Sequence, residues 1–286
     1  EYYAACAEAW QDYYARQAPL PTPPREKRSR SPRRGSGQHS AWTLSGILPH
    51  AVAYAKQQEA SKFLQDVLYG RYPTDDRAAL ANALMPAIVD LSRDVFGNHV
   101  VQALIEQSSM AQIEQIVAAL AGQFASLAKD KHACRVIQKL QRSSHLDSHR
   151  HKLEAEIVCF LGDLATNGNG NHVIQRAFED ASPGFLSNAI ASLLDTHSVR
   201  LLELAQNEYG CRAIQALLNR GKSLDMMVQL DPIVNELIES ALELCQHKSG
   251  NYVIQCVLDN ADFQKQQLVI EVVRENIGEI ARSKFG

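Results

Sequence analysis

The sequence lacks the features that mark several common protein classes. Its six cysteines include no C-x-x-C pair, which argues against a zinc ribbon or a disulfide framework and fits a reducing compartment. No apolar run approaches the ~18–20 residues of a transmembrane helix. The chain starts without methionine and without a charged-then-apolar leader, so we expect a fragment of a longer protein with no secretory signal. Nothing resembles a phosphate-binding loop, a catalytic carboxylate pair or a hydrolase elbow, so we predict no enzymatic activity and no cofactor.

The chain also lacks the positive charge that many nucleic-acid-binding proteins carry. Its formal net charge is −3 over 286 residues. Residues 1–40 hold seven Lys/Arg against four Asp/Glu, which leaves 22 against 28, or −6, for the remaining 246 residues. Bulk charge therefore gives no support for nucleic-acid binding, and any such function must depend on local chemistry.

The composition changes near residue 41. Residues 18–40 are rich in Pro, Arg and Ser and predict a disordered linker, whereas residues 42–286 show apolar residues at helical spacing and no alternating strands. The basic run Arg25–Arg34 is typical of a flexible linker, with a nuclear-import patch or a non-specific RNA contact as alternatives. Ahead of it, Tyr2–Gln17 resembles the tyrosine-rich C-terminal motif of far-upstream-element binding proteins, which implies at most a short partner-binding peptide.

Six short boxes repeat through residues 42–286, each with a small or polar residue, a basic or aromatic residue, two apolar residues and a glutamine. The boxes are Ser61–Gln65 (SKFLQ), Asn98–Gln102 (NHVVQ), Cys134–Gln138 (CRVIQ), Asn171–Gln175 (NHVIQ), Cys211–Gln215 (CRAIQ) and Asn251–Gln255 (NYVIQ). The glutamines are 37, 36, 37, 40 and 40 residues apart. Repeats of this length, with amphipathic stretches such as Met85–Arg93 and Met110–Leu120 between boxes, predict three helices per unit in a stacked solenoid. The two longer spacings predict lengthened outer loops near 182–197 and 220–232.

Each box should present a row of polar side chains when it is placed on a helix. Positions one and five, such as Asn98 and Gln102, are one turn apart and share a face. Positions three and four are apolar and should point inward, while position two, such as His99, flanks the polar pair. A carboxamide offers both a donor and an acceptor to a base edge, and a planar or cationic neighbour can stack on a base for roughly 1–3 kcal/mol. The pattern favours an interface for unpaired bases.

A less specific interpretation exists for each of these features. An Asn–Gln pair in one helix is usually a solvated face, but six glutamines in register, with position one alternating between Ser/Cys and Asn, are more ordered than packing requires. His145, His149, His151 and Glu154 form a weak candidate metal site in a polar stretch, and we expect no metal there. Cys134 and Cys211 have no sequence-evident catalytic partner, so we do not interpret them as nucleophiles.

The boxes GNHVVQ, ACRVIQ, GNHVIQ, GCRAIQ and GNYVIQ resemble those of the Pumilio (PUF) family, over roughly residues 45–286. The resemblance implies an all-α fold, a right-handed, arc-shaped α-solenoid of three-helix repeats in which each repeat reads one base of single-stranded RNA. In that family, Asn with Gln selects uracil and Cys or Ser with Gln selects adenine, on an RNA that runs antiparallel to the repeats. Lys62 departs from the usual arginine, and Ala60 and Ala133 replace glycine.

Carried over to this sequence, the resemblance assigns twelve base-edge residues and six stacking residues. The base-edge residues are Ser61, Gln65, Asn98, Gln102, Cys134, Gln138, Asn171, Gln175, Cys211, Gln215, Asn251 and Gln255. The stacking residues are Lys62, His99, Arg135, His172, Arg212 and Tyr252. The RNA read from 5′ to 3′ is UAUAUA, which fits the last six positions of the family element UGUANAUA. Because Ile280–Gly286 resembles Leu91–Gly97, the chain is expected to stop where a seventh of eight boxes would begin.

The same resemblance implies the biological setting. We expect a monomeric, cytoplasmic binder of mRNA 3′ untranslated regions that acts in post-transcriptional control, with effector proteins on its outer face and no membrane association. A nuclear pool would follow if Arg25–Arg34 acts as an import patch. Two other functions stay open at this point, a helical-repeat scaffold for proteins like armadillo or HEAT arrays, and a non-specific nucleic-acid binder.

Overall fold

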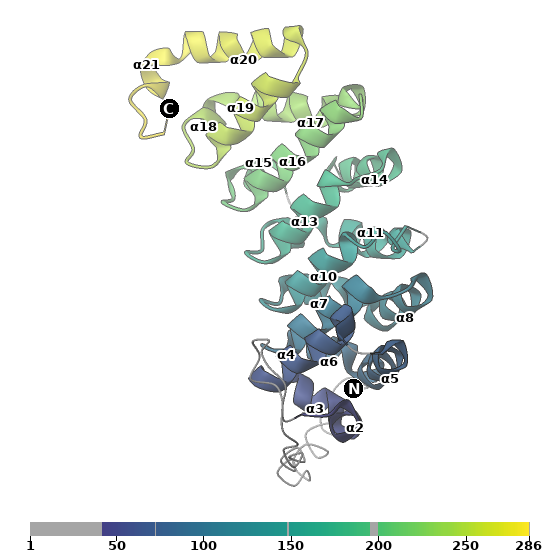
Figure 1. Cartoon of the computed structure of the whole chain (residues 1–286). Coiled ribbons are helices and arrows are strands. Elements are labelled where there is room, and N and C mark those ends of the chain that lie inside the picture. Colours follow the sequence, from purple (N-terminus) through teal and green to yellow (C-terminus); the bar gives the residue numbers. More distant parts are fainter. Residues whose placement is uncertain (1–41, 72, 148, 195–199, 286) are drawn as a thin grey trace, which may run out of the picture. The chain divides into compact units, whose positions relative to one another are not determined.

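The computed structural model describes residues 42–71, 73–147, 149–194 and 200–285 (Figure 1). The predicted aromatic peptide and basic linker of residues 1–41 lie outside the described residues. Backbone contacts divide the chain into two units, with the boundary after Ala51. The described part of the first unit holds α2 (Leu44–Ile47) and the 3-10 helix η1 (Leu48–His50).

Helices make up the second unit, and its described residues form no strand. The helices that carry the boxes, here called box helices, are α4 (Gln58–Asp66), α7 (Gly97–Gln107), α10 (Ala133–Gln141), α13 (Gly170–Glu179), α16 (Gly210–Ser223) and α19 (Gly250–Asn260). The outer helices are α5 (Thr74–Leu84), α8 (Met110–Leu120), α11 (Arg150–Cys159), α14 (Pro183–Leu194), α17 (Met227–Glu239) and α20 (Phe263–Glu275). Short middle helices join the two kinds: α6 (Ile88–Arg93) with η3 (Met85–Ala87), α9 (Phe124–Lys129), α12 (Leu161–Ala165), α15 (Leu201–Gln206), α18 (Ala241–Cys245) and α21 (Ile277–Ile280). The remaining elements are α3 (Ala51–Ala55) and the π-helical turn η2 (Val67–Arg71).

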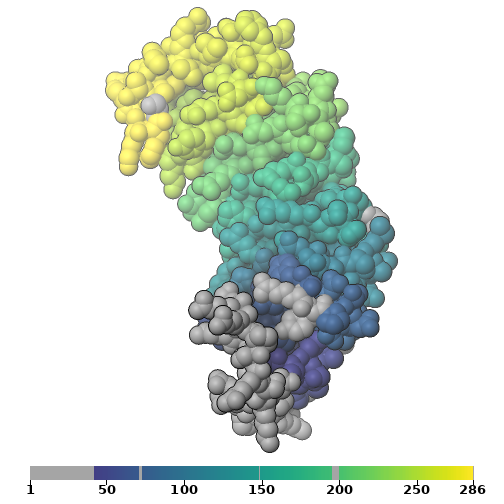
Figure 2. Space-filling view, in the orientation of Figure 1, coloured from purple at the N-terminus to yellow at the C-terminus, as the bar shows by residue number. Residues whose placement is uncertain are grey.

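The repeats stack in the order of the sequence. Each box helix contacts the next one, from α4 to α7 and onward through α10, α13, α16 and α19. The outer helices α11, α14, α17 and α20 contact one another in the same order. Figure 1 shows the labelled box and outer helices following one another in sequence order, and the colours of Figure 2 run along the second unit in the same order. The second unit is therefore an α-solenoid, as the repeat pattern predicted.

Apolar positions of the boxes form the centre of the stack. Positions three and four are buried in every box, from Phe63 and Leu64 at the first to Val253 and Ile254 at the last. Burying one such side chain contributes about 1.5–3 kcal/mol, so the box helices are held to the core by the residues beside their polar pairs. In the described part of the chain, no helix is long and apolar enough to cross a membrane.

The prediction of lengthened outer loops is wrong for residues 220–232. The box helix α16 continues to Ser223, and α17 begins at Met227. Leu217, Leu218 and Gly221 are buried, so the inserted residues keep the helical spacing of apolar groups and extend the helix instead of forming a loop. The turn closes through a hydrogen bond of 2.8 Å from the Met226 N–H to the Gly221 carbonyl. The other insertion ends in residues 195–199, which lie outside the described part.

Candidate nucleic-acid interface

A side-chain acceptor holds the entry turn of the five later box helices. Asp94 Oδ1 accepts hydrogen bonds from the N–H groups of Phe96 and Gly97 at 2.9 and 2.8 Å. The same pair of bonds recurs three residues before the first residue of each later box helix, and we call these acceptors the cap residues. They are Asp94, Asp130, Asn167, Asn207 and His247. Capping satisfies N–H groups that a helix start leaves unpaired and fixes the direction of the helix.

The N–H groups of the entry turn stabilise the charged form of the Asp130 carboxylate. Burial alone would raise the pKa of this carboxyl, but the N–H groups of Ala133 and His132, together with Arg93, hold the pKa below its ordinary value. Arg93 Nη1 lies 4.0 Å from Asp130 Oδ2. The sequence did contain a signal for the caps, an Asp, Asn or His three residues before each Gly or Ala, but the boxes alone did not reveal it.

Position one of the boxes is more buried than the sequence suggested. Positions one and five share a helix face, as the pattern predicted, but Asn98 is only 2% and Asn171 0% exposed. The physical reason is that the short carboxamide turns back to the entry turn, where Asn98 Nδ2 donates to the Asp94 and Val95 carbonyls at 2.8 and 3.0 Å. Asn171 repeats this geometry.

The Ser and Cys residues at position one also direct their donors to the entry turn. Ser61 Oγ donates to the Gln58 carbonyl at 2.9 Å. Cys134 Sγ and Cys211 Sγ donate to the Lys131 and Glu208 carbonyls, each at 3.6 Å. Burial raises the pKa of both thiols, so they stay protonated near neutral pH and serve as small, weak donors, not as nucleophiles.

Position five distinguishes the two kinds of box. In the Asn boxes, the glutamine Nε2 donates to the Asn Oδ1, at 2.9 Å for Gln102, 2.8 Å for Gln175 and 3.4 Å for Gln255. In the first and fifth boxes, Gln65 and Gln215 donate to the backbone carbonyl of position one at 3.1 Å.

Gln138 Nε2, in the third box, is buried with no partner. In the other five boxes the glutamine Nε2 donates within the box, in Gln175 both to Asn171 Oδ1 and to the Asn171 carbonyl at 3.3 Å. The carboxamide oxygen is therefore the group that a base edge can meet in each of these boxes.

Position two is exposed in every box, as the pattern predicted. These side chains are Lys62, His99, Arg135, His172, Arg212 and Tyr252. Between α16 and α19 they line an open groove together with position-one and position-five side chains. The lining residues are Cys211, Arg212 and Gln215 of α16, Tyr252 of α19, and Glu208, Tyr209, Lys248 and Ser249 of the two entry turns. The structure thus brings the base-edge residues of the fifth repeat close to the stacking residues of the fifth and sixth repeats.

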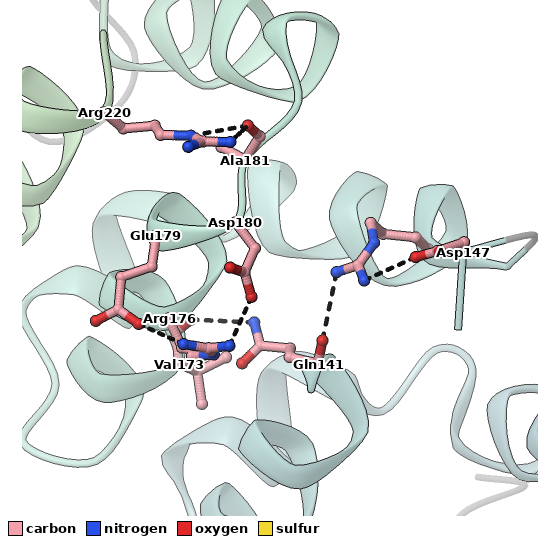
Figure 3. Close-up of polar contacts among 9 residues, drawn as sticks. Gln141, Asp147, Val173, Arg176, Glu179, Asp180, Ala181 and Arg220 are labelled. Atoms are coloured by element: carbon pink, nitrogen blue, oxygen red, sulfur yellow. Dashed lines mark hydrogen bonds and ion pairs between the residues drawn. The ribbon is translucent and has the colours of Figure 1, made fainter. Parts of the chain in front are cut away.

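Polar contacts between repeats keep the boxes in register (Figure 3). Gln141 Nε2 at the end of α10 donates to the Val173 carbonyl of α13 at 3.1 Å. Arg220 of α16 donates through Nε and Nη2 to the Ala181 carbonyl at 3.0 and 2.7 Å. Both acceptors are backbone carbonyls of a neighbouring repeat, so these bonds tie α10 to the repeat of α13, and α16 to the segment between α13 and α14.

The weak metal candidate gains no support from the geometry. Among the residues that the structure describes, no group of three or more His, Cys, Asp or Glu side chains could hold a metal ion. His149 Nε2 instead lies 4.0 Å from Glu114 Oε1, and burial raises the pKa of Glu154.

Comparisons with known proteins agree with this geometry. The profile of the Pumilio-family RNA binding repeat matches residues 87–121, 123–140, 161–186, 200–225 and 240–273. The Puf3 RNA binding domain bound to a Cox17 RNA 3′ UTR recognition sequence is 33% identical, with a TM-score of 0.72 over 85% of this chain and 70% of that one. The chain belongs to the Pumilio family. PUF-8 in complex with PBE-RNA is 26% identical, with a TM-score of 0.76 over 85% of this chain and 68% of that one.

Curated Pumilio relatives are longer than this chain. Pumilio homolog 12 of Arabidopsis thaliana is 29% identical over 224 residues, which is 77% of this chain and 36% of that protein. Five of the six Pumilio boxes fall within the matched segments. The first box, Ser61–Gln65, lies outside them, so its assignment depends on the sequence pattern and on the contact of α4 with α7.

Proposed function

We propose that this Pumilio chain binds single-stranded RNA sequence-specifically, with one base per repeat. The observation that carries the proposal is the groove between α16 and α19, which is lined by Cys211 and Gln215 together with the exposed side chains of Arg212 and Tyr252. A base placed there meets a carboxamide at its edge and a planar side chain on each face. Such contacts bind bases without a basic protein surface, which suits the acidic repeat region.

The register follows from the order of the boxes. If the RNA runs antiparallel to the repeats, as the family resemblance implies, the sixth repeat reads the first base of the hexamer. Asn251 with Gln255 then reads U, Cys211 with Gln215 reads A, and the alternation continues to Ser61 with Gln65. The proposed target is 5′-UAUAUA-3′, within an element such as 5′-UGUAUAUA-3′.

The hydrogen bonds inside the boxes support the difference between uracil and adenine. In an Asn box, Asn98 Oδ1 holds the amide nitrogen of Gln102, so the glutamine oxygen is the atom left for the N3–H donor of uracil. In a Cys box, the smaller side chain of Cys211 leaves more room beside Gln215, which suits the larger purine. Position one therefore selects the base by orienting the glutamine and by setting the space beside it.

A titration with two RNAs of equal composition tests this function. We expect the chain to bind 5′-UGUAUAUA-3′ at least about a hundredfold more tightly than 5′-AAAGUUUU-3′ at one fixed salt concentration, because specific sites exceed non-specific ones by three orders of magnitude or more in comparable systems. Equal affinity for the two RNAs would contradict sequence specificity and favour a non-specific binder. No binding to either would favour a helical-repeat scaffold for proteins.

Removing one stacking side chain should weaken binding by a limited amount. Tyr252 is 55% exposed at the edge of the groove. We expect Tyr252→Ala to reduce the affinity for 5′-UGUAUAUA-3′ about tenfold, since stacking contributes roughly 1–3 kcal/mol per base. Tyr252→Phe keeps the ring and should bind as the wild type does. Phe263→Ala, an exposed aromatic residue of α20 outside the boxes, is the matched control. An equal loss in both alanine variants would contradict the stacking role.

The biological setting belongs to the same proposal. A chain that recognises a short mRNA element can regulate translation and stability if its outer helices bind effector proteins, and we place this activity in the cytoplasm with the chain as a monomer. A reporter mRNA with 5′-UGUAUAUA-3′ in its 3′ untranslated region should change in expression when the chain is present. The same reporter with the scrambled element should not respond, and an equal response of both would contradict a sequence-directed role.

A further inference from the structure

The sixth repeat differs from its neighbours in the residue that caps its box helix. Four cap residues are Asp or Asn, but the fifth is His247, whose Nδ1 accepts from the N–H groups of Ser249 and Gly250 at 3.1 and 3.2 Å. In the preceding repeat, Asn207 Oδ1 accepts the equivalent pair at 2.9 and 3.0 Å. The imidazole therefore replaces a carboxylate or carboxamide oxygen at the same place.

An imidazole can cap the helix only while it is neutral. With two N–H donors facing Nδ1, the ring proton must be on Nε2. Histidine is the side chain whose charge ordinarily changes between about pH 5 and 8. Protonation turns Nδ1 into a donor that faces two other donors, so the cap is intact at higher pH and is lost as the pH falls. The amide oxygen of Asn207 does not change over this range.

The capping turn also holds the base-reading side chain of the repeat. The His247 carbonyl accepts from Asn251 Nδ2 at 2.8 Å and from the Asn251 N–H at 3.2 Å. The same turn contributes Lys248 and Ser249 to the groove between α16 and α19. If the turn opens, Asn251 loses its anchor, and with it the orientation of Gln255.

The charged and titratable groups that the structure describes near the turn do not pair with His247. The groove beside it is lined by Glu208, Tyr209, Cys211, Arg212, Lys248 and Tyr252. Two flanking carboxylates have other partners, since Glu243 accepts from Gln206 and Glu279 accepts from Gln246. On α17 and α20, which also contact α18, Asp231 and Asp262 both pair with Lys265. Within the described residues, no carboxylate forms an ion pair with His247 to hold a protonated ring in place.

We propose that His247 is a positioning residue whose protonation weakens the reading of one base, the uracil assigned to Asn251 and Gln255. The inference rests on the proposed RNA-binding function for its biological consequence. Its structural part concerns the chain alone and can be measured without RNA. Four of the other box helices are capped by Asp or Asn, so the loss that follows from the cap would be confined to the third base of 5′-UGUAUAUA-3′.

The RNA experiment compares the wild type with His247→Asn, which restores the cap used by the two preceding repeats. Between pH 7.5 and 5.5, we expect the wild type to lose about fivefold more affinity for 5′-UGUAUAUA-3′ than His247→Asn does, in line with the usual cost of a lost cap. The ratio of the affinities for 5′-UGUAUAUA-3′ and 5′-UGCAUAUA-3′ should be smaller at pH 5.5 than at pH 7.5 in the wild type, and should stay the same in His247→Asn. His145→Asn, an exposed histidine outside the boxes, should behave as the wild type. Equal pH profiles for the wild type and His247→Asn would overturn the proposal.

A measurement without RNA separates this inference from the proposed function. The ratio of amide hydrogen-exchange rates of Gly250 and Gly210 cancels the intrinsic effect of pH, because the two N–H groups occupy equivalent places under different caps. We expect this ratio to rise severalfold between pH 7.5 and 5.5 in the wild type and to stay constant in His247→Asn. A constant ratio in the wild type would overturn the inference even if the RNA binds. A rising ratio in a chain that binds no RNA would support the switch and contradict the function.

Discussion

Gly210→Ala should destabilise the chain by about 1–3 kcal/mol, the usual range for forcing an extra carbon into a well-packed site. A Cβ built on Gly210 would lie 2.4 Å from the Leu204 carbonyl oxygen and 2.6 Å from Leu204 Cδ1. The first neighbour is backbone of the middle helix α15, which cannot turn aside as a side chain can. The box helix α16 must therefore shift, and the contacts that bury Ile214 weaken with it.

Urea unfolding monitored by circular dichroism measures this effect. We expect the midpoint of Gly210→Ala to fall clearly below that of the wild type. The matched control is Gly184→Ala in α14, where an added Cβ meets no atom within 4 Å. This control should keep or slightly raise the midpoint, because Ala is the better helix former by about 1 kcal/mol. An unchanged midpoint for Gly210→Ala would show that the middle and box helices are not in the close contact described here.

Much of the fold could be predicted from the spacing of apolar residues. The stretch Met110–Leu120 is the helix α8 with the same bounds, and Met85–Arg93 is the 3-10 turn η3 followed by α6. This success has a physical cause, since stacking units of one length bury the same faces and repeat the same pattern. Within the described residues, the pattern misled at 220–232, where extra residues with apolar groups at helical spacing lengthened α16.

The candidate site was predicted less completely than the fold. The exposed position two and the buried positions three and four follow from helical geometry, which sequence spacing reveals. The burial of Asn98 does not, because it depends on two backbone carbonyls of the preceding turn that accept from its Nδ2. The caps were missed for the same reason, since Asp94 or His247 is an ordinary polar loop residue until the N–H groups of its turn are placed. Hydrogen bonds between side chains and the backbone of a turn are therefore hard to predict from the sequence pattern.

The second large effect concerns the choice of base. Asn98→Cys converts the second box from the Asn kind to the Cys kind and leaves Gln102 in place. The mutation removes the Oδ1 acceptor that now holds Gln102 Nε2 at 2.9 Å, and it frees space beside the glutamine. We expect preference at the seventh base of the element to change from U to A. The ratio of the affinity for RNA with U at the seventh base to that for RNA with A there should change by about a hundredfold, since one base contact discriminates by roughly 1–3 kcal/mol.

Position-specific controls make this variant informative. Asn171→Cys introduces the same side chain into the fourth box, where it should change the preference at the fifth base and leave the seventh unaltered. Cys134 and Cys211 already occupy the same position in the third and fifth boxes, with their thiols bonded to the entry turn, so the new side chain has a geometry that the fold accepts. A general loss of affinity for all RNAs would indicate damage to the repeat, which the unfolding midpoint detects independently.

The most direct test of one base per repeat is therefore the affinity of Asn98→Cys for 5′-UGUAUAUA-3′ and 5′-UGUAUAAA-3′, measured beside the wild type at the same salt concentration. The assignment predicts that the wild type binds the first RNA more tightly and that Asn98→Cys binds the second more tightly. A variant that keeps the wild-type preference at the seventh base, or changes its preference at a different base, would contradict it.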